Sequence, residues 1–141
     1  MTPDQMLRVL AFMEATWNQD AAAMGALASG GPQETAIAPL IAQYGETVLQ
    51  TLLMRSFGVS DSMDPAELQA LREQMDRDPG VKMCVVLAEA LKGWAEADDP
   101  QAAGRIALTV ISAILAFSAE ATEDDVLPMI AALRAGVIRQ N

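Results

Sequence analysis

The chain lacks the residues on which most enzyme and metal chemistry depends. It has no histidine and only one cysteine, Cys84, among 141 residues. Histidine is the commonest general base and transition-metal ligand, and one cysteine cannot supply a structural zinc site. Gly30-Gly31 is followed by Pro32 and lacks the lysine and hydroxyl of a phosphate-binding loop. The sequence therefore predicts a protein that is not an enzyme and that holds no cofactor and no metal.

Basic residues are also scarce: nine Lys and Arg stand against nineteen Asp and Glu, which gives a net charge of −10. Such a field repels phosphate backbones and anionic lipid, so we expect no nucleic-acid partner and no membrane partner. The first five residues do not begin a signal peptide, and one cysteine suits the reducing cytoplasm. The strongest apolar run, Ile106–Phe117, has twelve residues where about twenty span a bilayer.

Aromatic residues make up only 4% of the chain, whereas apolar residues make up 52%. Leu, Ile, Val, Met and Ala must then build the core, and most of these favour helices. Capping residues followed by proline, as in Thr2-Pro3 and Asp64-Pro65, indicate helix starts. We predict one all-α domain over 1–141, a compact bundle of about six to eight helices. Its central helix, residues 101–118, is expected to have neighbours on every side.

Two predictions concern helix boundaries. The apolar positions between residues 36 and 57 keep one helical phase straight through Gly45, which predicts a single helix there. The segment Arg77-Asp78-Pro79-Gly80 has the composition of a turn, so we expect the following helix to begin at Val81.

The acidic turn from Glu120 to Asp125 has two interpretations. Its carboxylates are of the type that Ca²⁺ or Mg²⁺ prefers, but the spacing is not that of an EF-hand. Capping of the last helix, starting near Asp125, is the interpretation we favour. Together with Asp99-Pro100-Gln101-Ala102-Ala103, this turn resembles the helix, acidic turn, helix arrangement of tellurite-resistance TerB-like domains. The Asp-Gly of such turns is replaced by Ala119-Glu120, so no fold or metal site is transferred.

Four apolar residues are candidates for an interaction surface. Leu7 and Phe12 lie off the main apolar stripe of the first helix, so more than one side of that helix is apolar. Met54 lies beside the stripe of its helix, and Met63 lies in a polar loop. Methionines fill cores but also line adaptable binding surfaces. The leading hypothesis is a non-enzymatic protein-interaction module (an adaptor, a chaperone or a neutralising partner), with self-association into a homodimer included.

The alternative is a helical bundle that binds a small molecule or lipid in an apolar pocket. The candidate pocket residues are Trp17 and Trp94, near the central helix, with Thr109 or Ser112 as a buried polar group. The simpler role of those hydroxyls is to bond the carbonyl one helical turn back. Cys84 lies among valines and methionine, which predicts a buried, unreactive thiol.

Overall fold

The computed structural model describes residues 1–32, 34–97 and 99–139. Their regular elements are seven α-helices and one short 3₁₀ turn, which confirms the all-α prediction. The elements are α1 (Pro3–Trp17), α2 (Ala21–Ala28), α3 (Ile37–Ser56), α4 (Pro65–Arg77), α5 (Pro79–Ala95), α6 (Pro100–Phe117), η1 (Glu123–Asp125) and α7 (Val126–Arg139).

The helix starts follow local capping chemistry. Thr2 and Asp64 each form a reciprocal capping box with the residue three positions on, and proline occupies the first helical position after each. One predicted boundary is wrong. The Asp78 side chain accepts a hydrogen bond from the Val81 backbone N–H, so α5 begins at Pro79 and the expected turn is part of its first turn.

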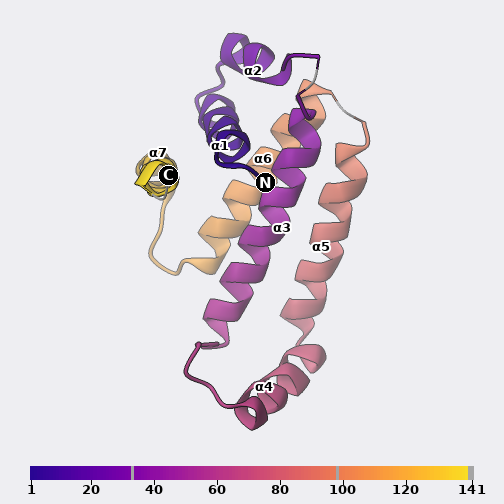
Figure 1. Cartoon of the computed structure of the whole chain (residues 1–141), viewed down its shortest axis with the longest axis vertical. Coiled ribbons are helices and arrows are strands. Elements are labelled where there is room, and N and C mark those ends of the chain that lie inside the picture. Colours follow the sequence, from indigo (N-terminus) through magenta and orange to yellow (C-terminus); the bar gives the residue numbers. More distant parts are fainter. Residues whose placement is uncertain (33, 98, 140–141) are drawn as a thin grey trace.

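Helices α3, α5 and α6 run side by side along the long axis of the molecule (Figure 1). Helix α2 lies at one end, where it packs on α1, and α4 lies at the opposite end, where it packs on α5. Helix α7 packs against α1. The layers are therefore complete at the end that holds α1, α2 and α7, and thin at the end that holds α4.

Helix α3 is unbroken through Gly45, as predicted, and the structure shows why glycine is there. A Cβ at this position would stand 2.6 Å from Val110 Cγ2 of α6 and 3.0 Å from Leu91 Cδ1 of α5. Glycine thus allows α3 to approach both neighbours closely.

Helix α6 is buried on one face only. Ala103, Ile106, Val110 and Ile111 lie in the core, but Leu108 is 43% exposed. The expectation that this helix has neighbours on every side is therefore wrong for its outer face. Among the described residues, α6 is the one helix whose length and composition would suffice to cross a membrane, a test that core helices also pass.

The buried residues fall in two segments of the chain. We call residues 1–49 and 91–139 the body, and residues 50–90 the arm. Among the residues that the structure describes, every buried one belongs to the body, and no residue of the arm is buried. The arm consists of the C-terminal end of α3, all of α4 and most of α5 (Figure 1).

Candidate functional site

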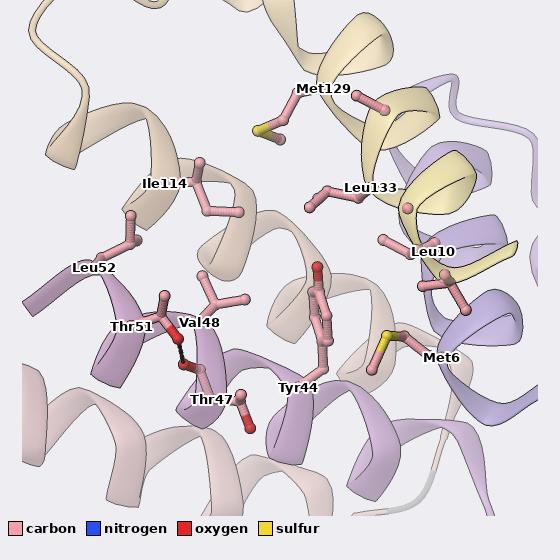
Figure 2. A pocket seen from close by; sticks show the side chains of 13 residues that line it. Met6, Leu10, Tyr44, Thr47, Val48, Thr51, Leu52, Ile114, Met129 and Leu133 are labelled. Atoms are coloured by element: carbon pink, nitrogen blue, oxygen red, sulfur yellow. Dashed lines mark hydrogen bonds between the residues drawn. The ribbon is translucent and has the colours of Figure 1, made fainter. Parts of the chain in front are cut away.

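An open apolar groove of about 560 Å³ lies between α1, α3, α6 and α7, mostly within the body but with Thr51 and Leu52 of the arm among its lining residues. Figure 2 shows its side chains converging from these helices. The lining residues are Met6, Leu10, Tyr44, Thr47, Val48, Thr51, Leu52, Ile114, Met129, Ala132, Leu133, Gly136 and Val137. None of them is charged. On the other side of α7, Arg134 pairs with Glu14 and so joins α7 to α1.

Tyr44 is the distinctive residue of this groove. Its side chain points from α3 into the groove (Figure 2), and the residue is only 7% exposed. Among the hydrogen bonds of the described residues, none involves the Tyr44 hydroxyl, whereas Thr47 and Thr51 donate to the carbonyls of Gln43 and Thr47 at 3.1 and 2.8 Å. Burial raises the pKa of Tyr44, so the phenol stays protonated and can donate.

The arm carries an exposed apolar surface on α5. Three apolar side chains of α5 are each more than half exposed, namely Met83, Val85 and Val86. Further along the same helix, Trp94 is 47% exposed. Met83, Val86 and Trp94 recur at spacings that place them along one side of a helix. Val85, two positions from Met83, lies on the other flank of Val86. We call these three exposed side chains, Met83, Val85 and Val86, the arm surface.

Two charges of opposite sign flank the arm surface, Lys82 before it and Glu89 after it. Glu89 also accepts a bond from Lys92 at 3.3 Å, and Lys92 bonds Glu46 of α3 at 2.9 Å. These hydrogen bonds, that to Glu46 first, raise the pKa of Lys92. The bond to Glu46 joins α5 to α3 where the arm meets the body.

Cys84 faces the seam between α5 and α3, with Leu49 and Leu53 lining the same shallow hollow. It is half-buried rather than buried. Burial and the nearby negative charge of Asp78 raise the pKa of its thiol. The thiol is therefore protonated at neutral pH, as expected for an unreactive cysteine.

The four residues predicted for an interaction surface do not form one surface. Phe12 is fully buried in the core, so its assignment to a surface is wrong; the second apolar side of α1 packs inside this chain. Leu7 is half-buried in the body. Met54 is 48% exposed and Met63 is half-buried, and both belong to the arm.

The two residues predicted for a pocket are also apart. Trp17 packs against the core, while Trp94 lines a hollow of about 660 Å³ between α5 and α6 together with Thr109. Trp17 is not among the residues that line it, and the charged side chains of Asp99 and Arg105 are. The Thr109 hydroxyl donates to the Arg105 carbonyl at 2.8 Å, the simpler of the two predicted roles.

The acidic turn caps η1, the 3₁₀ turn directly before α7, rather than α7 itself. The Asp125 carboxylate accepts bonds from the backbone N–H of Thr122 at 2.8 Å and from its hydroxyl at 3.1 Å. These bonds lower the pKa of Asp125. Across the part of the chain that the structure describes, no three Cys, Asp or Glu side chains come together as a metal site would require.

Sequence reasoning missed Tyr44 as a site residue because it lies on an apolar stripe, which is typical of core positions. The sequence feature that could have identified this residue is a tyrosine hydroxyl on an apolar stripe, one helical turn from Thr47 and Val48. Comparison of the chain with protein-family models, curated proteins and solved structures gives no match.

Proposed function

We propose that this chain is a non-enzymatic protein-interaction module and that it associates through its arm, with a second copy of itself as the partner. The observation that carries the proposal is that no residue between 50 and 90 is buried, although apolar side chains recur along α4 and α5. An amphipathic helix pair needs another layer to cover its apolar face. The lack of histidine in the chain agrees with a role without catalysis.

The total exposed surface area of the chain is larger than that expected for a compact monomer, which supports an interface that a partner would cover. A compact monomer of this mass is expected to expose about 7,000 Å². The 15.0 kDa chain exposes 8725 Å². The difference, roughly 1,700 Å², exceeds the ~800 Å² that each partner contributes to a standard stable interface.

The charges around the arm surface support self-association. In a two-fold antiparallel pair of α5 helices centred between Val85 and Val86, Lys82 of each copy faces Glu89 of the other. The Lys82–Glu89 contact then occurs twice, because an isologous interface contains each pair of residues two times, and both copies of the contact are attractive. Exposed ion pairs contribute little energy each, but they set the register of the pairing.

Charge reversal tests this arrangement. Lys82→Glu places like charges opposite each other twice and should weaken the dimer at least about ten-fold in sedimentation velocity. The swap Lys82→Glu/Glu89→Lys should restore it. Arg139→Glu, which makes the same change in net charge at an exposed position of the body, is the matched control and should have no effect.

Two results would contradict the proposal. Wild-type protein that stays monomeric at micromolar concentration would remove self-association altogether. Equal weakening by Lys82→Glu and Arg139→Glu would show that only net charge matters and that the arm surface has no special part.

A further inference from the structure

The apolar groove of the body has the size and lining of a small-molecule site. Its volume of about 560 Å³ lies within the range of roughly 300–1,000 Å³ that is usual for ligand pockets. Such pockets are lined mainly by apolar side chains, with a few polar groups that fix orientation. Here the methionines Met6 and Met129 lie on opposite sides of the groove (Figure 2) and can adapt their shape to an occupant.

Tyr44 supplies the polar group. It is more than nine-tenths buried, it points into the groove, and its hydroxyl is absent from the hydrogen bonds of the described residues. No buried side-chain polar atom of the described residues lacks a hydrogen-bond partner, so the Tyr44 hydroxyl reaches the open space of the groove, where a bound acceptor oxygen can take its hydrogen bond in place of water. The two threonine hydroxyls of the groove already bond helix carbonyls. The hydroxyl of Tyr44 is therefore the donor that a ligand can use.

The lining also determines the charge of the occupant. No charged side chain lines the groove, so a buried carboxylate or ammonium would lose its hydration without gaining a partner. The net charge of −10 adds to the penalty for an anion. The chemistry thus favours an uncharged molecule over a free fatty acid.

We propose that the groove binds one uncharged, mainly apolar small molecule whose carbonyl or hydroxyl oxygen accepts a hydrogen bond from the Tyr44 hydroxyl. The lining of the groove does not include Met83, Val85 or Val86, so the site is separate from the arm surface and does not depend on self-association.

Gly136 offers a way to close the groove without harming the fold. A Cβ at this position of α7 would meet no atom within 4 Å. Gly136→Leu should therefore fill the groove, and losing a helical glycine should hold or raise the melting temperature. Gly25→Leu is the matched control, because Gly25 is a helical glycine with the same open surroundings outside the groove.

The probe is Prodan, an uncharged naphthalene ketone whose fluorescence reports its surroundings. We expect saturable binding to wild-type protein and to Gly25→Leu, and loss of binding in Gly136→Leu. Tyr44→Phe removes one hydrogen bond and no other contact, so affinity should fall roughly three- to ten-fold while the melting temperature holds. Decan-2-one should displace the probe, and decanoate should not.

Each other outcome overturns the proposal. No saturable binding of Prodan, or equal binding by Gly136→Leu, would show that the groove is not the site. Unchanged affinity in Tyr44→Phe, or equal displacement by decanoate, would remove the role of the hydroxyl or the preference for uncharged ligands. Val86→Glu should bind Prodan as wild type does. A loss there would make the groove part of the interface between copies.

Discussion

The body and the arm are made of the same kind of helix, yet only the body has a core. Helices begin in both with the same chemistry: Thr2 caps α1 of the body, and Asp64 caps α4 of the arm. In the body, α1 and α6 cover α3, so apolar side chains are enclosed. In the arm, α4 packs on α5, and Thr51 and Leu52 of α3 line the open groove, so no residue there is buried. Local sequence is enough to form helices, but burial needs another layer.

The largest expected contrast is between core and arm truncations. Phe12→Ala should lower the free energy of unfolding by about 3–5 kcal/mol, because it leaves a cavity in the body. Leu68→Ala, at an exposed position of the arm, should change it by no more than about 0.5 kcal/mol. Urea unfolding of dilute protein, in which dimers dissociate, measures both. Similar losses would mean that the arm is packed within one chain.

A smaller contrast concerns two helical glycines of the body. Gly45→Ala should destabilise the fold, since overpacking against Val110 and Leu91 costs about 1–3 kcal/mol and the helix gains only about 1 kcal/mol. Gly93→Ala, with open surroundings, should stabilise it by up to about 1 kcal/mol. Thermal melts compare the two. If Gly45→Ala also stabilises the fold, α3 and α6 do not approach each other this closely. In the double variant Gly45→Ala/Val110→Ala, the smaller side chain at position 110 should relieve the crowding.

The smallest effect is at Cys84, on the seam of the arm. Because burial and Asp78 raise the pKa of this thiol, its alkylation by iodoacetamide at pH 8 should be slower than that of the unfolded chain. Asp78→Asn keeps the cap of α5 but removes the negative charge, so alkylation should become modestly faster. The rate is followed by mass spectrometry. Folded and unfolded rates that coincide would show an exposed thiol and an open seam.

Much of the fold follows from local patterns. The caps at Thr2 and Asp64 and the unbroken phase across Gly45 predicted helices that the structure confirms. The start of α5 was misplaced because Asp-Pro-Gly is typical of turns as well as of a capped first turn.

The candidate sites were harder to predict, because periodicity shows that a side of a helix is apolar but not what it meets. Phe12 was assigned to a surface, but its side of α1 packs in the core. Trp94 was assigned with Trp17 to one pocket, although it lies on the exposed side of α5. The arm surface was missed since Val85 and Val86 read as buried residues in a sequence. Only the arrangement of helices shows which apolar face lacks a neighbour.

The central claim is that the arm surface is a docking surface, and Val86→Glu tests it most directly. Ile138→Glu is the matched control, because both side chains are aliphatic, helical and 60% exposed, one in the arm and one in the body. We predict that wild-type protein and Ile138→Glu sediment as dimers, while Val86→Glu sediments as a monomer with unchanged helicity by circular dichroism. A monomeric wild type, or three proteins that sediment alike, would contradict the account.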